Sequence, residues 1–134
     1  PITKSMLAWW AFNNNEQAYL SLNQSFEIEH IYAKNRQDTD SGLVDKKNLE
    51  RLGNKSLLEK SINIRVSDFR FEDKVKKYKG YMNDKGKNIE GTKIQDLLSL
   101  NEKYPEFNEE DIEKRNDLII NTFINYLELE NLYK

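Results

Sequence analysis

The stretch FEIEHIYAKN, residues 26–35, alternates apolar and polar side chains and then becomes mostly polar. Alternation with a period of two is typical of a strand that buries one of its faces. The strand is expected to end near His30, the only histidine in the chain, which directly follows Glu29. A lone histidine is more often structural than catalytic, so the residues around His30 must decide its role.

Two further segments complete a small strand–strand–helix element. The sequence NLERLGNKSLLE, residues 48–59, has Gly53 at a turn and then an apolar stretch that predicts a second strand. Ser67 or Asp68 is expected to cap a helix with the sequence FRFEDKVKKYKGY. The predicted element spans about residues 26–79.

Helices are predicted around this element. Residues 3–12 have a strongly apolar face, and Asn108 can cap a long helix whose first turn is acidic. We predict this C-terminal helix over about residues 108–133, and a loop over residues 83–92. The predicted fold class is therefore α+β and mostly helical, with helices surrounding the strand–strand–helix core.

The composition indicates one domain over residues 1–134. The chain has no cysteine, which excludes a disulfide scaffold and a cysteine-ligated zinc site, and a reducing cytoplasm is expected. It contains neither a membrane-length apolar run nor a signal-peptide pattern, which favours a soluble protein. Because the chain begins with Pro1 and an apolar helix follows within a few residues, we interpret it as the C-terminal part of a larger protein.

The charge is distributed unevenly along the chain. The net charge is -2, yet residues 30–87 hold 15 lysines and arginines against nine acidic residues, a balance of +6. Residues 1–29 have a balance of -2 and residues 88–134 a balance of -6. The basic zone thus follows His30 and could attract a polyanion. On charge alone, a solvated surface of mixed charge is an equally good interpretation.

Two asparagines stand at informative positions after His30. Asn54 lies just past Gly53, and Asn63 follows the predicted second strand. Asparagine is unfavourable inside regular elements, because its side chain competes for backbone hydrogen bonds. Its amide oxygen is a good ligand for a hard cation beside a carboxylate. Glu29 and Asn63 could thus hold one Mg²⁺, Asn54 could pin the histidine loop, and His30 could take a proton from water.

With these residues the chain resembles the HNH nucleases of the ββα-metal fold. It is most similar to the DUF1524 family, the C-terminal nuclease domain of GmrSD-like restriction enzymes and their relatives that contain a DUF262 domain. Five stretches carry the resemblance: IEHI at 28–31, LGNKSLL at 52–58, Asn63, SDFRFEDKVKKY at 67–78 and DIEKRNDLI at 111–119. Each stretch is weak alone, but their order and spacing together are fairly specific.

The resemblance implies a metal-dependent DNA endonuclease or nickase that serves restriction or phage defence. It implies Mg²⁺ or Mn²⁺ as the cofactor and assigns roles to several residues. These are His30 as general base, Glu29 and Asn63 as metal ligands, Asn54 as the residue that orients the histidine loop, and Lys74 as a basic residue close to the site. Arg115 matches the arginine of the last stretch.

The resemblance also implies DNA as the partner and a separate N-terminal domain, DUF262-like, for recognition and nucleotide hydrolysis. For contact with phosphate we expect Lys55, Lys74, Lys76 and Lys77. One departure concerns the loop after the histidine, where the family usually has an apolar residue and a proline after EHI. Tyr32 and Ala33 stand there instead, which puts the rigidity of the loop in question rather than the chemistry.

Two other interpretations stay open. The domain could be a binding module without catalysis that docks on DNA or on a partner domain. It could also be a helical structural piece whose likeness to the HNH nucleases is accidental. A structure bears on the second alternative, because Glu29, His30 and Asn63 must converge in a nuclease of the expected design.

Overall fold

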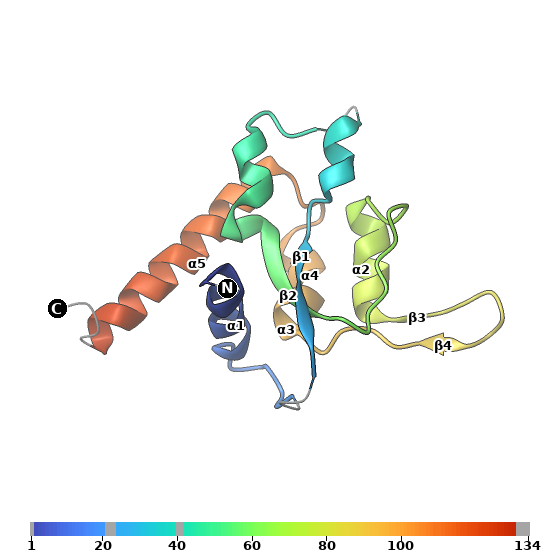
Figure 1. The fold of residues 1–134 in the computed structure, drawn as a ribbon, viewed down its shortest axis with the longest axis horizontal. Coiled ribbons are helices and arrows are strands. Elements are labelled where there is room, and N and C mark those ends of the chain that lie inside the picture. The colour runs from blue at the N-terminus through green and yellow to red at the C-terminus, as the bar shows by residue number, and fades with distance from the viewer. Residues whose placement is uncertain (1, 21–23, 40–41, 131–134) are drawn as a thin grey trace.

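The structure is a computed structural model that describes residues 2–20, 24–39 and 42–130 (Figure 1). Its helices are α1 (Ile2–Phe12), α2 (Phe71–Lys79), α3 (Gln95–Leu98), α4 (Leu100–Lys103) and α5 (Glu109–Leu129). Its strands are β1 (Phe26–His30), β2 (Lys55–Glu59), β3 (Tyr81–Met82) and β4 (Asn88–Ile89). Short 3₁₀ helices are η1 (Lys34–Asp38), η2 (Lys46–Glu50) and η3 (Leu52–Asn54). The predicted α+β, mostly helical fold class is confirmed.

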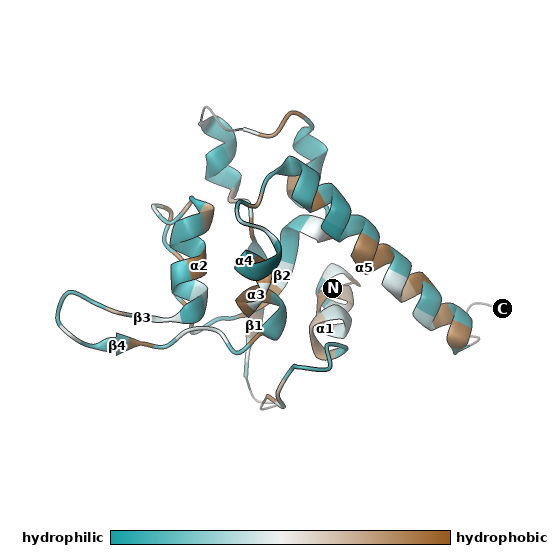
Figure 2. Ribbon diagram, turned by 180° about the vertical axis from the view of Figure 1, so that it is seen from behind, coloured by the Kyte–Doolittle hydropathy of each residue, from teal (hydrophilic) through white to brown (hydrophobic). Residues whose placement is uncertain are grey.

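The centre of the fold is an antiparallel pair of strands. β1 pairs with β2, with Phe26 opposite Glu59 and His30 opposite Lys55. The two opposite views in Figures 1 and 2 place this pair between α1 and α2. Buried Leu57 and Leu58 of β2 join the hydrophobic core. The strand–strand–helix order expected from the sequence is therefore present, and His30 lies at one end of the strand pair.

Helix α5 runs along the side of the molecule that faces away from α2 (Figure 1). Its N-terminus has the expected cap, because the Asn108 side chain accepts from the backbone of Asp111 and the Asp111 carboxylate accepts from the backbone of Asn108. Trp9 of α1 packs edge-on against Phe123 of α5, with ring centroids 4.9 Å apart. The helix ends at Leu129, and residues 131–133 of the predicted helix lie outside the described residues.

Helix α2 begins later than the sequence suggests. Its N-cap is Arg70, whose side chain makes no capping hydrogen bond. Asp68, one of the two expected caps, instead accepts a hydrogen bond from the backbone of Arg65 and pairs with Lys77 at 3.6 Å. The helix ends at Lys79, and the C-cap residue Gly80 has a φ of 85°, which suits glycine. The carboxylate of Asp68 is thus engaged by Arg65 and Lys77 and does not cap α2, which starts three residues later.

The predicted loop over residues 83–92 contains part of a second, smaller hairpin formed by β3 and β4. Asn83 closes its turn, because the Asn83 side-chain oxygen accepts from the backbone amides of Lys85 and Lys87. Gly86 has a φ of 76°, a conformation that glycine adopts without strain. Strands of two residues are too short to show a period, which is why the sequence pattern indicated only a loop.

None of the helices in the described part of the chain is both long enough and apolar enough to cross a membrane.

Candidate active site

His30 belongs to a cluster of charged side chains that meet at Glu50, at one end of the strand pair. Its Nε2 atom lies 3.1 Å from Oε1 and 3.3 Å from Oε2 of Glu50, which ends η2. The ammonium groups of Lys55 and Lys34 lie 3.1 Å and 3.5 Å from the same carboxylate. The side chain of His30 is 19 % exposed and that of Glu50 is 54 % exposed, so solvent reaches the cluster.

The electrostatics of this cluster favour a neutral imidazole and an ionised carboxylate. Burial lowers the pKa of His30 below its ordinary value, and Glu50 offsets this effect only in part. Burial raises the pKa of Glu50, but hydrogen bonds from Lys55 and His30 together outweigh it and bring that pKa to about 2. At neutral pH, His30 can therefore accept a proton.

The side chain of Asn54 binds the backbone of the loop that follows His30. Its Oδ1 accepts a hydrogen bond from the backbone of Tyr32 at 2.6 Å, and its Nδ2 donates to the carbonyls of Tyr32 and Leu49. Its side chain is fully buried. These are the contacts expected of a residue that holds the histidine loop in place. Ala33 has a φ of -67°, close to the value that proline would impose, so the backbone takes that shape without a proline.

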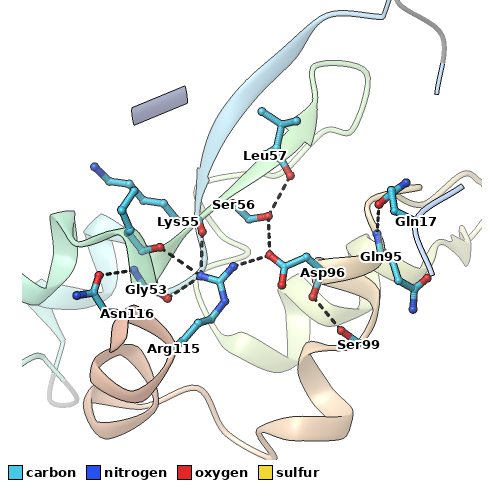
Figure 3. Close-up of polar contacts among 11 residues, drawn as sticks. Gln17, Gly53, Lys55, Ser56, Leu57, Gln95, Asp96, Ser99, Arg115 and Asn116 are labelled. Carbon is cyan, nitrogen blue, oxygen red and sulfur yellow. Dashed lines mark hydrogen bonds and ion pairs between the residues drawn. The ribbon is translucent and has the colours of Figure 1, made fainter. Parts of the chain in front are cut away.

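The turn that carries Asn54 is fixed in turn by α5 (Figure 3). Buried Arg115 donates from Nη1 to the carbonyls of Gly53 at 2.8 Å and Lys55 at 2.9 Å, and from Nη2 to the carboxylate of Asp96. Gly53 permits the close approach, because a Cβ atom there would lie 2.1 Å from the carbonyl oxygen of Ile112. The role of Arg115 in this structure is thus to support the site rather than to line it.

Glu29 points away from His30 into a buried polar cluster against α2. Its Oε2 accepts a hydrogen bond from the Tyr78 hydroxyl at 2.6 Å and from the Lys74 ammonium at 3.1 Å. Lys74 also donates to the backbone carbonyl of His30 at 2.7 Å, and its side chain is only 4 % exposed. Burial raises the pKa of Tyr78 well above its ordinary value, so its hydroxyl stays a donor.

Asn63 lies at the other end of the strand pair. It follows β2 beyond Glu59, which pairs with Phe26, and it lines a surface hollow with Lys77 and Tyr81 near the end of α2. No hydrogen bond or ion pair among the described residues joins Asn63 to Glu29 or to His30. The three groups expected to converge do not do so: Glu29 and His30 are neighbours, and Asn63 is remote.

The donor set expected for Mg²⁺ or Mn²⁺ does not fit this arrangement. A ligand pair needs two oxygens that face one point, whereas Glu29 is engaged by Lys74 and Tyr78 and Asn63 stands elsewhere. Within residues 2–20, 24–39 and 42–130, no group of three or more histidine and acidic side chains could hold a metal ion.

The four lysines expected to contact DNA occupy different environments. Lys74 is buried, so its position does not support contact with phosphate. Lys77 pairs with Asp68 and donates to the hydroxyl of Tyr81. Lys55 belongs to the cluster around His30, and its side chain is 12 % exposed. Lys76 is exposed, with its ammonium 5.1 Å from the centre of the Tyr81 ring.

Three residues of the site escaped the sequence analysis. Tyr78 could have been found, because it lies four residues after Lys74 and helical spacing puts both on one face. Glu50 and Lys34 carried no such signal. They stand in polar segments without a period, and Glu50 is separated from His30 by 20 residues of sequence.

Comparison with known proteins identifies one family. The model of the family described as "GmrSD restriction endonucleases, C-terminal domain" matches residues 4–122. The search of curated proteins and the search of solved structures gave no match.

Proposed function

This chain belongs to the family of C-terminal domains of GmrSD restriction endonucleases, and we propose that it is the DNA-cleaving part of a restriction or phage-defence protein. Within that family we assign it to the HNH, or DUF1524, type. In this proposal His30 is the general base of a hydrolase that cuts or nicks DNA.

The pair formed by His30 and Glu50 carries the proposal. A general base must be unprotonated at the working pH and reachable by water. His30 meets both needs, because its pKa is lowered and its side chain is partly exposed. In the proposed step His30 takes a proton from a water molecule whose oxygen attacks phosphorus. The bond from phosphorus to the 3′ oxygen breaks, and that oxygen is protonated by solvent, which leaves a 5′ phosphate and a 3′ hydroxyl.

The lysines beside His30 supply positive charge where the phosphodiester would approach. The side chain of Lys34 is 64 % exposed, and Lys34 and Lys55 both pair with the carboxylate of Glu50. Cationic groups around a reacting phosphate neutralise part of its negative charge. Their electrostatic interaction with the phosphate becomes stronger as water is excluded. We therefore propose Lys34 and Lys55 for contact with the scissile phosphate, and Lys76 for contact farther along the strand.

Mg²⁺ or Mn²⁺ stays in the proposal on the strength of the resemblance alone. We assign it no ligands and no step, because Glu29 and Asn63 do not face one another. The remaining partners are also proposals. They are DNA and, in a longer protein, a DUF262-like N-terminal domain that would select the sequence or modification to be cut. The alternative of a docking module without catalysis makes the same binding predictions but no cleavage.

Nicking of supercoiled plasmid by this chain tests the function. We expect nicking with Mg²⁺ or Mn²⁺, none with EDTA, and a rate about 10²- to 10⁴-fold lower in His30→Ala. Added imidazole should restore part of that loss, because it can enter the space left by the ring. Glu27→Ala, an exposed change on the same strand, is the control and should nick as the parent does.

Three outcomes contradict the proposal in different ways. A His30→Ala variant that keeps its fold and nicks at the parental rate removes His30 as the base. A parent chain that binds DNA without nicking it under any metal condition favours the docking module. Undiminished nicking in EDTA removes the metal from the proposal.

A further inference from the structure

We propose that Glu50 is a positioning residue for His30: it holds the imidazole with a hydrogen on Nε2, so that Nδ1 is the atom that accepts the proton from water. This inference rests on the proposed function for its catalytic meaning. The geometric basis is the contact between the His30 ring and the Glu50 carboxylate, which does not depend on that function.

The tautomer follows from the chemistry of the two partners. An ionised carboxylate has no hydrogen and can only accept a hydrogen bond. Both oxygens of Glu50 lie within 3.3 Å of Nε2, so Nε2 must be the donor. A neutral imidazole carries one N–H, which leaves the lone pair on Nδ1. Among the described residues, Nδ1 makes no hydrogen bond.

The charges around His30 come from four elements. Glu50 faces it from η2, Lys34 from η1 and Lys55 from β2, while Lys74 of α2 contacts only its backbone carbonyl. Although burial raises the pKa of Glu50, Lys55 and His30 lower it to about 2, so Glu50 is ionised at neutral pH, and an ionised Glu50 excludes the opposite tautomer. In addition to burial, the positive charges of Lys34 and Lys55 act on His30 directly, and both lower its pKa.

The segment that carries Glu50 is itself held in place. Glu109 at the start of α5 accepts hydrogen bonds from the backbone of Val44 and Asp45 and from the side chain of Asn48, which lie before and within η2. Glu50 is exposed, so its ion pairs add little to stability. Its position next to the one imidazole of the chain is better explained by what it does to that ring.

A carboxylate behind a catalytic imidazole has two effects. It fixes the ring and its tautomer, and it stabilises the imidazolium that forms when the base takes a proton. Both effects favour the step assigned to His30. Loss of Glu50 would leave burial and two lysines, all of which disfavour the protonated ring.

The single histidine makes a direct test possible by ¹⁵N NMR, because every imidazole signal of this 134-residue chain belongs to His30. We expect the neutral parent to show the tautomer with the hydrogen on Nε2. In Glu50→Gln and Glu50→Ala we expect a weaker preference for that tautomer and a lower His30 pKa than in the parent. Glu27→Gln makes the same change of charge at an exposed position on β1 and should alter neither.

Kinetics of plasmid nicking give the second readout. Glu50→Gln should lower kcat by about 10- to 100-fold with little change in KM for DNA, as expected when a partner of a catalytic group is lost. The acid limb of kcat should move to lower pH, and Glu50→Asp should recover part of kcat.

The results separate this inference from the proposed function. A parent with the hydrogen on Nδ1, or a His30 pKa in Glu50→Gln equal to that in Glu27→Gln, overturns the role of Glu50 even if the chain nicks DNA. A parent that does not nick DNA overturns the proposed function. The tautomer and the titration would still decide whether Glu50 holds the ring as proposed.

Discussion

At the scale of single residues, two asparagines that look alike in sequence have opposite environments. Asn54 is fully buried and uses its amide as both donor and acceptor toward the histidine loop. Asn63 is exposed and lines a hollow at the far end of the strand pair. If a buried amide is removed, water cannot reach the backbone groups that it bonded. If an exposed amide is removed, water can take over its hydrogen bonds.

This contrast predicts opposite results for the two alanine variants. Asn54→Ala leaves backbone groups of Tyr32 and Leu49 without partners and should lower the free energy of unfolding by about 2–4 kcal/mol, with nicking impaired. Asn63→Ala should change that free energy by less than about 0.5 kcal/mol and leave nicking within twofold of the parent. Urea denaturation and plasmid nicking measure both quantities. Loss of nicking in Asn63→Ala that excess Mg²⁺ restores would bring Asn63 back as a metal ligand.

At the scale of elements, the site depends on contact between η3 and the first half of α5. Gly53 lies against the backbone of α5, and its amide donates to the side chain of Asn116 at 3.0 Å. Arg115 then satisfies carbonyls on either side of Asn54 and pairs with buried Asp96. One helix thus fixes the turn that holds the histidine loop.

Removing the guanidinium of Arg115 should destabilise the fold. Arg115→Met keeps an unbranched apolar stem but removes the guanidinium and leaves Asp96 as a buried unpaired charge, so we expect a loss of about 3–5 kcal/mol in the free energy of unfolding. Asp96→Asn in the same chain should recover part of the loss. Arg51→Met, at an exposed arginine beside η3, is the matched control and should change stability little. Equal midpoints in urea for Arg115→Met and Arg51→Met would contradict this account.

At the scale of the whole molecule, the basic balance of residues 30–87 overstates the charge available to DNA. Lys74 is buried against Glu29, and Lys77 is held by Asp68. Acidic residues crowd α5, which runs along the side away from α2 (Figure 1). A polyanion would therefore meet fewer cations than the count of basic residues suggests.

We expect weak DNA binding by this chain, with about three phosphate contacts and a slope of roughly -3 in a plot of log affinity against log salt. Lys76→Ala should reduce the magnitude of that slope by about 1. Lys114→Ala removes the same charge from α5, where the ammonium pairs with Glu110, and should leave the slope unchanged. Fluorescence anisotropy with a duplex at several salt concentrations measures it. An equal effect of the two variants would show that the binding face lies elsewhere.

Much of the architecture could be predicted from the sequence, because local chemistry determines it. The alternation that ends at His30, the cap at Asn108 and the stop at Gly80 are all encoded within a few neighbouring residues, and they yield β1, α5 and α2. The order of the motifs similarly indicated the restriction-nuclease family that the family match then established.

The partners of the site residues were decided only by the tertiary structure. Its carboxylate and the family resemblance indicate Glu29 as a metal ligand. In the fold, alternation along β1 sends the side chains of Glu29 and His30 to opposite faces, and Glu29 meets Lys74 and Tyr78, 45 and 49 residues later. His30 meets Glu50 because strand pairing and a 3₁₀ turn bring them together. Sequence patterns report spacing along an element, whereas a partner across the fold depends on how the elements pack, and packing leaves no period in the sequence to read.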